Sequence, residues 1–277
     1  MRDKIEKILK DNPINILHNG IYVFDVINDY YHAHEDELAV LMTKEIDSQI
    51  LDQWALFKQE FWDEVRDEVS DEKDIVYIGA GKDNAFKDFP NNLFINLDLV
   101  RSNLEDLKSN GAKFCLQADL RNLPFVSGSL DVVVIVDLIH HFKTRGLDQV
   151  LYEVSRVLKP GGKIYLAEIN KYAFFRLPYS FFPHLAIRIL REIKSLFVKK
   201  YHKPESYEGP LSMDKVVQKA RHFGLIWAKE YTLRSYPEIK GFNLRIWRLL
   251  SKIKRIRRKN GFHWFIRLDK LDEKEGV

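Results

Sequence analysis

The chain has almost no cysteine and no long hydrophobic run. Cys115 is the only cysteine among 277 residues, which excludes an internal disulfide and a zinc site built from several cysteines. No stretch reaches the roughly 18 apolar residues that a membrane-spanning helix needs, and the N-terminal residues contain no apolar signal core. With an ordinary hydrophobic content of 45%, these absences predict an intracellular, cytoplasmic protein.

Charge is divided unevenly along the chain, although the overall net charge is only +4. Residues 1–170 contain 19 Lys and Arg against 30 Asp and Glu, whereas residues 171–277 contain 25 against 10. The first part therefore has a net charge of −11 and the second part a net charge of +15. The basic part is suited to an anionic partner. The alternative is that the two parts neutralise one another across a shared interface.

A glycine-containing segment, Ile75–Asn84, carries the strongest functional signal. Its apolar start predicts a buried strand, and Gly79-Ala80-Gly81 predicts a sharp turn into a helix whose N-terminal amides point at a ligand. A second apolar run ends at Asp98, about 20 residues after the glycines. A carboxylate at the tip of that second strand suits the two hydroxyls of a ribose. The pattern therefore predicts a cofactor that contains a nucleoside.

Short apolar runs alternate with amphipathic or loop segments from residue 75 onwards. The runs predicted as strands are Ile75–Ile78, Leu93–Leu97, Lys113–Leu116, Val132–Val136, Lys163–Ala167 and Phe262–Leu268. Strands that alternate with helices form a mostly parallel sheet with both faces covered. We therefore expect a doubly wound α/β fold of three layers.

Helical periodicity is clear on both sides of these strands. Residues Ile50–Val69 and Gly146–Leu158 place apolar side chains at three- and four-residue spacings, which predicts amphipathic helices. A further helix is predicted over Ser212–Phe223, with Ser212 as its N-terminal cap.

Five separated signals together resemble the class I S-adenosylmethionine-dependent methyltransferases, including small-molecule and quinone-biosynthesis methyltransferases. The matching pieces are Ile75–Asn84, Asp98, Ala118–Leu120 with Asn122–Phe125, Leu130–Phe142, and Glu153–Ala167, which contains Arg156-Val-Leu-Lys-Pro-Gly-Gly162. A nicotinamide-dependent enzyme could share the glycine loop and Asp98, but the Leu-Pro-Phe and Leu-Lys-Pro-Gly-Gly elements are not expected in it. The resemblance implies a seven-stranded, mostly parallel sheet with an antiparallel strand near the C-terminus.

The resemblance also implies S-adenosylmethionine as the cofactor and S-adenosylhomocysteine as its product. The implied cofactor-binding residues are Gly79, Ala80, Gly81, Asp83, Leu97, Asp98, Asp119, Leu120, Ile135, Val136 and Asp137. Among them, the glycine loop would pass beneath the methionine portion, and Asp98 would accept hydrogen bonds from the ribose. Asp119 would meet the adenine amino group beside Leu120. Residues 135–137, at the end of the fourth strand, would flank the reactive sulfonium.

The chain departs from the family pattern at two positions of the glycine loop. Tyr77 stands where the family usually has an acidic residue that helps to hold the cofactor's amino group, and Asp83 stands where a third glycine is common. One hypothesis is that Asp83 supplies the missing negative charge. The other is that Asp83 only caps the following helix.

Methyl transfer to a hydroxyl group would also need a base near the acceptor. The candidates for this catalytic role are Asp137, His140 and His141, which follow the fourth strand directly. Asp137 could hold the cofactor instead of moving a proton, and a histidine at position 141 often serves packing in the family. His32 and His34 lie near acidic residues, but the reaction needs no metal, so we predict a solvated helix face there and no metal site.

The resemblance and the changes in composition divide the chain into four parts. Residues 1–72 are predicted to form an N-terminal helical segment, and residues 73–170 the Rossmann-like cofactor-binding core. Residues 171–211 are predicted to be a helical cover over the substrate. Residues 212–277 would complete the sheet and carry a basic amphipathic insertion at 239–260.

The acceptor is specified less directly than the cofactor. The chain lacks the Asn/Asp-Pro-Pro-aromatic signature of nucleobase amine methylation and the Pro-Cys context of cytosine methylation. The basic segments near 185–203 and 239–259 could contact an anionic membrane, grip the phosphates of RNA or pack on the core. We predict a small-molecule or lipid-like acceptor, with peripheral contact to the inner membrane face as an option. The alternatives are an RNA methyltransferase and a catalytically silent cofactor-binding protein.

Overall fold

The computed structural model of the chain describes residues 2–10, 13–24, 48–142, 144–170, 212–233, 245–246, 249–250, 252–253, 261 and 263–272. Three parts of the sequence interpretation lie outside these residues: the cover at 171–211, the pair His32 and His34, and most of the basic insertion at 239–260. Among the described residues, no helix combines the length and apolar character needed to cross a membrane.

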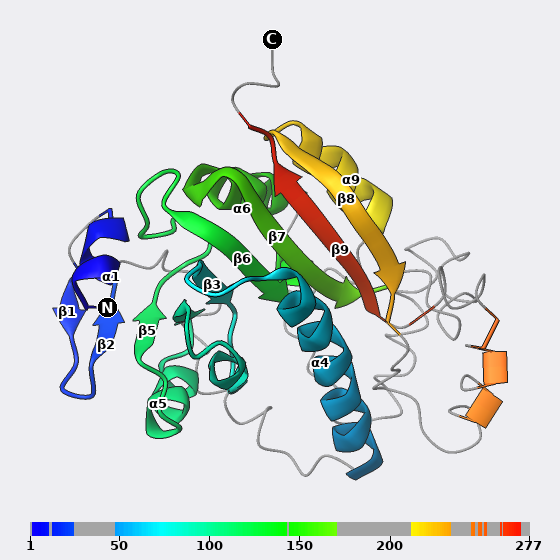
Figure 1. The fold of residues 1–277 in the computed structure, drawn as a ribbon, viewed down its shortest axis with the longest axis horizontal. Helices are drawn as coiled ribbons and strands as arrows, with labels where there is room; N and C mark the ends of the chain where they lie inside the picture. Colours follow the sequence, from blue (N-terminus) through cyan, green and yellow to red (C-terminus); the bar gives the residue numbers. More distant parts are fainter. Residues whose placement is uncertain are drawn as a thin grey trace, which may run out of the picture.

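A nine-stranded mixed sheet runs through the centre of the molecule (Figure 1). Its central parallel strands are, in spatial order, β5 (Phe114–Gln117), β4 (Leu93–Asp98), β3 (Asp74–Ile78), β6 (Leu130–Val136) and β7 (Leu158–Ile169). Beyond β7, the antiparallel partners are β9 (His263–Lys270) and then β8 (Leu225–Thr232). All six runs predicted as strands overlap strands of this sheet. The predicted α/β class, mostly parallel with an antiparallel strand near the C-terminus, is confirmed.

Two short strands near the N-terminus extend the sheet beyond the seven that we expected. β2 (Ile21–Val23) pairs parallel with β5, and β1 (Asn15–Ile16) pairs antiparallel with β2. The prediction that residues 1–72 form a helical segment is therefore wrong for this hairpin. Gly20, with a φ of +79°, allows the chain to reverse after Asn19, and Asn-Gly is a strong hairpin signal. The branched and aromatic residues of β2 then fit a half-buried extended surface.

Helices cover both faces of the sheet, which gives the predicted three layers. The helices are α1 (Arg2–Ile8), α4 (Ser48–Glu68), α5 (Arg101–Ser109), α6 (Thr144–Val157) and α9 (Met213–Arg221). One cluster of buried apolar side chains joins α1, α6 and α9 to one face, and a second cluster joins α4 and α5 to the other. Ser212 caps α9 as predicted, because its hydroxyl accepts a hydrogen bond from the backbone N–H of Lys215 at 3.3 Å.

The segment after the glycine loop differs from the prediction. It forms only a four-residue 3-10 helix, η1 (Ala85–Asp88), and the prediction of a helix that points its N-terminal amides at the ligand is wrong. Pro90 follows almost at once and disfavours helical backbone in the residue before it, and β4 then begins at Leu93. The cap position of η1 belongs to Asn84, so the interpretation of Asp83 as a helix cap is also wrong.

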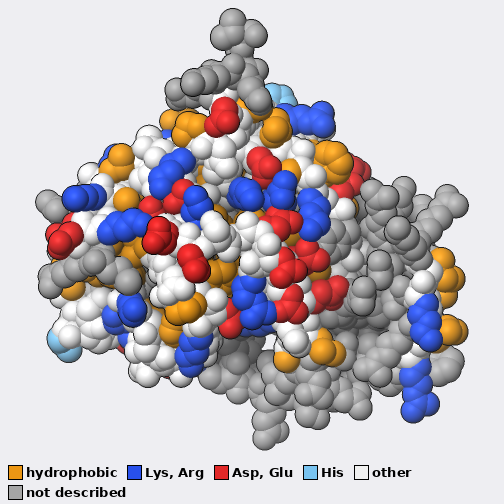
Figure 2. All heavy atoms as spheres, in the orientation of Figure 1, with side chains coloured by type: hydrophobic (Ala, Val, Ile, Leu, Met, Phe, Trp, Pro, Cys, Tyr) orange, Lys and Arg blue, Asp and Glu red, His pale blue; other side chains and the backbone are white. Residues whose placement is uncertain are grey.

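An ionic network around Glu68 ties α4 to the C-terminal strands. The Glu68 carboxylate accepts hydrogen bonds from Arg267 of β9 at 2.7 Å, from Lys229 of β8 at 3.0 Å and from the Tyr165 hydroxyl of β7 at 3.2 Å. Lys229 also pairs with Glu64 at 2.8 Å. Figure 2 shows acidic and basic side chains intermixed on this side of the molecule rather than a patch of one sign. The acidic and basic parts of the chain therefore neutralise one another here, as the interface alternative predicted.

Glu68 should make the folded state sensitive to acid. Burial alone raises the pKa of Glu68, but the hydrogen bonds from Arg267 and Lys229 outweigh burial and hold the pKa below its ordinary value of 4.5. Such a carboxyl group stabilises the fold above its unfolded pKa, and the contribution is lost as the pH falls through the folded pKa. We expect Glu68→Gln to lower the free energy of unfolding by about 1–3 kcal/mol at neutral pH. Urea unfolding should show a smaller difference below about pH 4; equal losses at both pH values would contradict this assignment.

Candidate cofactor-binding site

A cavity of about 250 Å³ opens at the carboxyl ends of β3, β4 and β5, beside the short helix η2 (Ile139–His141). In open α/β sheets, ligands bind in the crevice outside the carboxyl ends of the strands. Six of the predicted cofactor-binding residues line this cavity: Gly79, Gly81, Leu97, Asp98, Asp119 and Leu120. The others, which are not among the lining residues, are Ala80, Asp83, Ile135, Val136 and Asp137. Asp137 was also predicted as a catalytic base, together with His140 and His141. Of these two histidines, His141 lines the cavity and His140 does not.

The glycine loop needs its glycines for two different reasons. Gly79 and Gly81 have φ values of +69° and +54°, a region that side chains other than glycine rarely adopt. A Cβ atom at Gly79 would lie 2.9 Å from Cδ2 of Leu138, so the end of the Leu138 side chain would have to move to make room for it. A Cβ atom at Gly81 would meet no atom within 4 Å, so this residue leaves open space at the cavity wall. The loop therefore allows a ligand to approach the backbone closely.

Asp98 holds the glycine loop at the end of β4. Its carboxylate oxygen Oδ2 accepts a hydrogen bond from the backbone N–H of Gly81 at 2.7 Å, and Oδ1 accepts one from Val100 at 2.8 Å. Burial raises the pKa of Asp98 above its ordinary value, while these backbone donors act in the opposite direction. The Asn103 side chain and the Leu99 backbone N–H also donate to this carboxylate. Asp98 therefore anchors the loop, and the two hydroxyls of a ribose would have to share the carboxylate with these donors.

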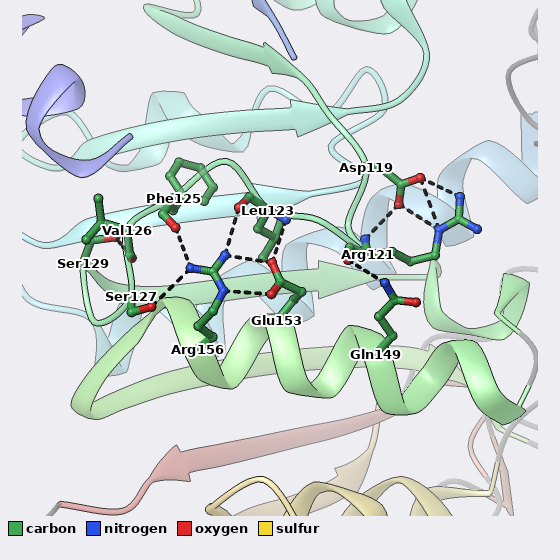
Figure 3. Close-up of polar contacts among 10 residues, drawn as sticks. All are labelled: Asp119, Arg121, Leu123, Phe125, Val126, Ser127, Ser129, Gln149, Glu153 and Arg156. Atoms are coloured by element: carbon green, nitrogen blue, oxygen red, sulfur yellow. Dashed lines mark hydrogen bonds and ion pairs between the residues drawn. The ribbon is translucent and has the colours of Figure 1, made fainter. Parts of the chain in front are cut away.

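Asp119 forms a bidentate ion pair with Arg121 at the other end of the cavity (Figure 3). The guanidinium group donates to Oδ1 at 3.0 Å and to Oδ2 at 2.5 Å, and the Arg121 backbone N–H also donates to Oδ1 at 2.8 Å. Arg121 lines the cavity and lies over the Phe142 ring at 5.9 Å. An adenine amino group that binds Asp119, as predicted, would therefore have to share this carboxylate with the Arg121 side chain.

A second ion pair fastens the loop that follows Asp119 (Figure 3). Arg156 of α6 donates to the carbonyls of Leu123 and Phe125 at 2.9 and 2.7 Å, and to both oxygens of Glu153 at 2.8 Å. Glu153 in turn accepts a hydrogen bond from the backbone N–H of Leu123 at 2.8 Å. These contacts explain the Arg156 and Leu-Pro-Phe elements of the sequence pattern: the pair clamps the loop against α6, and the loop carries the Asp119 end of the cavity.

Tyr77 and Asp83 form a pair on the α4 side of the glycine loop. The Tyr77 hydroxyl donates to Oδ2 of Asp83 at 3.4 Å, and Nε1 of Trp62 donates to the same oxygen at 3.1 Å. Lys58 adds an ion pair at 3.3 Å. Burial and the nearby carboxylates of Asp83 and Asp137 raise the pKa of Tyr77. The carboxylate on this side of the glycine loop is thus Asp83, which three donors from β3 and α4 hold.

The two histidines of η2 occupy different environments. His140 is buried, and its Nδ1 hydrogen bonds Oε1 of the fully buried Glu168 at 2.7 Å. His141 lines the cavity, and its ring lies 4.0 Å from the His140 ring. Burial, with a smaller effect of His140, lowers the pKa of His141 to about 3. His141 is therefore neutral at physiological pH and would be a weak base.

Asp137 contacts a histidine that the sequence analysis did not single out. Nε2 of His263 lies 2.9 Å from Oδ2 of Asp137. Arg121 and Glu168 were missed as well. Arg121 could have been found as the cation nearest to Asp119 in the same loop. Glu168 and His263 could have been found only from the strand pairing: β9 is antiparallel, so its first residue reaches the edge at which the parallel strands end.

Comparison with known proteins matches residues 76–166 to the family described as a methyltransferase domain. Over 95 residues the chain is 33% identical to a candidate methyltransferase of Encephalitozoon cuniculi, a match that covers 34% of this chain and 45% of that protein. The chain thus spans less than half the length of this curated relative.

Two solved structures share the fold. One is the candidate methyltransferase in a complex with the Haloferax volcanii Trm112 methyltransferase activator, with a TM-score of 0.55 and 15% identity, covering 89% of this chain and 100% of the other. The second is a Thermotoga maritima protein described as an S-adenosylmethionine-dependent methyltransferase and possible histamine N-methyltransferase. It has a TM-score of 0.54 and 17% identity, with 87% of this chain and 100% of the other covered.

The strand order β5-β4-β3-β6-β7-β9-β8, with the glycine loop and Asp98 at its carboxyl edge, defines the class I methyltransferase fold. The family match over residues 76–166 then makes the identification more specific. Residues 76–166 thus match a methyltransferase domain, and the chain has the fold of S-adenosylmethionine-dependent methyltransferases, in agreement with the family and the cofactor that the sequence motifs implied.

Proposed function

We propose that the protein transfers a methyl group from S-adenosylmethionine to a small-molecule or lipid-like acceptor. The observation that carries this proposal is Asp98, a buried carboxylate that fixes the glycine loop and faces the cavity from the end of β4. The cofactor supplies a methyl group activated by the positive charge on sulfur, so the protein must chiefly bind, align and exclude water.

The residues present fit this cofactor in three places. Asp98 suits the ribose hydroxyls, and Gly81 leaves open space beside the loop. Leu120 and Phe142 offer apolar surface to an adenine ring, with Asp119 and Arg121 at its edge. The carboxylate of Asp83, held by Tyr77, supports electrostatic attraction of the cationic methionine end. The silent-protein alternative, which depended on the missing acid at position 77, is weakened by the Asp83 charge.

Two features of the sequence bear on the class of methyl acceptor. The missing nucleobase-methylation signatures favour a small or lipid-like acceptor over RNA. The net charge of +15 in residues 171–277 supports peripheral contact with an anionic membrane, and it also keeps RNA as the second candidate. Ion pairs such as Glu68–Arg267 neutralise part of this positive charge within the protein. Less of the charge is therefore available to attract a membrane or RNA than the sequence count suggests.

The decisive experiment has two stages. Calorimetry with the full-length protein should show binding of S-adenosylmethionine and S-adenosylhomocysteine, with no binding of NADH as the control nucleotide. Incubation with methyl-labelled S-adenosylmethionine and cell extract should then place the label in the lipid or small-metabolite fraction. Label in RNA would replace the proposed acceptor by the second candidate. A folded protein that binds neither S-adenosylmethionine nor its demethylated product would overturn the function itself.

A further inference from the structure

Asp137 is held in a strained conformation at the end of β6. Its φ of +48° lies in the left-handed region, which residues other than glycine seldom adopt, although Asp does so more often than most. Two contacts hold it there. The backbone N–H donates to the carbonyl of Ala167 at 2.9 Å, and Oδ2 lies 2.9 Å from Nε2 of His263. Strain of this kind is concentrated at functional sites, so it directs attention to what the carboxylate does.

His263 is fixed more rigidly than a surface ion-pair partner would be. It is the first residue of β9, pairs with Ile169 of β7, and is fully buried. Its ring stacks on Phe57 of α4 with centroids 3.9 Å apart and planes 18° apart, and meets the edge of Trp54 at 5.5 Å. Because an ionised carboxylate has no hydrogen to donate, Nε2 must carry the shared hydrogen. The ring thus sets the orientation of the Asp137 carboxylate.

This arrangement leaves the second carboxylate oxygen without a donor. Oδ1 of Asp137 is buried and accepts no hydrogen bond from any residue that the structure describes. Buried carboxylate oxygens normally accept hydrogen bonds, and one without a donor is costly. Asp137 directly precedes Leu138, which lines the cavity and packs against Gly79. Asp137 is therefore the neighbour in sequence of a residue of the cavity wall, although it is not itself a lining residue.

The other two predicted bases are less suited to accept a proton. His140 already shares its Nδ1 hydrogen with the buried Glu168. His141 faces the cavity, but burial leaves its ring a weak base, as described above. Of the three candidates, Asp137 alone combines rigid orientation with an oxygen that has acceptor capacity to spare.

We propose that Asp137 accepts the proton of the methyl acceptor through Oδ1, and that His263 is the positioning residue that aims this oxygen. The proposal rests on the proposed methyltransferase function. As the acceptor's oxygen or nitrogen bonds to the methyl carbon, the carbon–sulfur bond breaks and its electron pair remains on sulfur. The acceptor's proton passes to Oδ1 of Asp137 and later to water. The acceptor therefore belongs to the class of hydroxyl or amine compounds that carry a hydrogen on the atom methylated.

The test compares Asp137→Asn, His263→Leu and His263→Gln with the wild-type protein, all full length. His222→Gln serves as the matched control, because His222 is exposed and its ring hydrogen bonds the backbone carbonyl of Gln218, away from the cavity lining. Each protein is measured for S-adenosylmethionine affinity by calorimetry and for the rate of label transfer into small-metabolite and lipid extracts. Nitrogen-15 NMR of labelled histidine rings, with His263→Gln to assign the signal, reports whether Nε2 of His263 carries hydrogen.

We expect Asp137→Asn and His263→Leu to lower the transfer rate about 100-fold or more while changing S-adenosylmethionine affinity by less than about threefold. His263→Gln, whose amide can donate to Asp137 in place of the ring, should recover part of the rate. The wild-type ring should show hydrogen on Nε2, and His222→Gln should behave as wild type.

Several results would overturn the proposal that Asp137 accepts the proton and that His263 positions it. They are wild-type transfer in Asp137→Asn, a parallel loss of cofactor affinity and transfer, no recovery by His263→Gln, or a wild-type ring without hydrogen on Nε2. A wild-type protein that binds the cofactor but labels no extract also counts against Asp137 as a proton acceptor. Absence of cofactor binding in the wild type would instead overturn the proposed function, so the two failures are distinguishable.

Discussion

Asp98→Ala should weaken S-adenosylmethionine binding about 100-fold or more, because it removes a charged acceptor for two ribose hydroxyls. The substitution also removes the bond to the Gly81 N–H, so the glycine loop loses its anchor at the cavity wall. Both effects act on the same ligand, and methyl transfer should fall with the affinity. Isothermal calorimetry with the cofactor and with S-adenosylhomocysteine measures the change directly.

Glu105→Ala is the appropriate control for this experiment. Glu105 is an exposed carboxylate on α5, close to Asp98 in the sequence but not among the residues that line the cavity. Its removal changes the net charge by the same amount and should leave the affinity within about twofold of the wild type. Unchanged affinity in a folded Asp98→Ala protein would mean that the ribose is not bound at this carboxylate.

Arg156→Leu should cost about 3–5 kcal/mol of stability, because it breaks a largely buried ion pair and leaves the partner charge behind. The substitution removes the Arg156 donors to Glu153 and to the carbonyls of Leu123 and Phe125. Among the residues that the structure describes, the Leu123 N–H then remains as the donor to the Glu153 carboxylate. Guanidinium chloride unfolding at neutral pH gives the free energy. The loop that carries Asp119 should also loosen, and cofactor affinity should fall in the fraction that remains folded.

Arg66→Leu provides a matched comparison within the same protein. Arg66 also pairs with an acidic residue three positions earlier in a helix, Asp63, but both side chains are more than 40% exposed. Exposed pairs contribute about 0–1 kcal/mol. The two arginines therefore differ in burial and backbone contacts rather than in spacing. If Arg156→Leu were no more destabilising than Arg66→Leu, the clamp would have no structural role.

Local patterns in the sequence were sufficient to predict the central sheet and the acidic end of the cofactor site. The apolar runs and the spacing of Asp98 depend only on residues near one another in the chain. The glycine loop was also recognised correctly, but the helix after it was not, because Pro90 and the early start of β4 override the preference of the intervening residues. The N-terminal hairpin was missed because two very short strands show too little alternation to compete with a helical interpretation.

The histidine that pairs with Asp137 could not be predicted from local patterns. His263 reaches Asp137 across 126 positions of sequence, through an antiparallel strand whose pairing no single segment reveals. His141 has the right residue type in the right place, yet burial changes its chemistry. Likewise, Asp83 became interpretable only when Trp62 and Lys58 of α4 were found beside it. Residue type and spacing thus predict which residues line the cavity better than they predict how the neighbouring side chains pair.

The tie between α4 and the last strand has a consequence for biosynthesis. Glu68 and Arg267 are 199 positions apart, so this face of the sheet cannot be closed until β9 has been translated. Contacts of such long range slow folding, because the loop between the partners must be closed before the contact stabilises anything. The aromatic side of α4, with Phe57 and Phe61, lacks its β9 partners His263 and Phe265 until β9 has been translated. A nascent chain arrested before residue 263 should therefore require a chaperone to remain unaggregated.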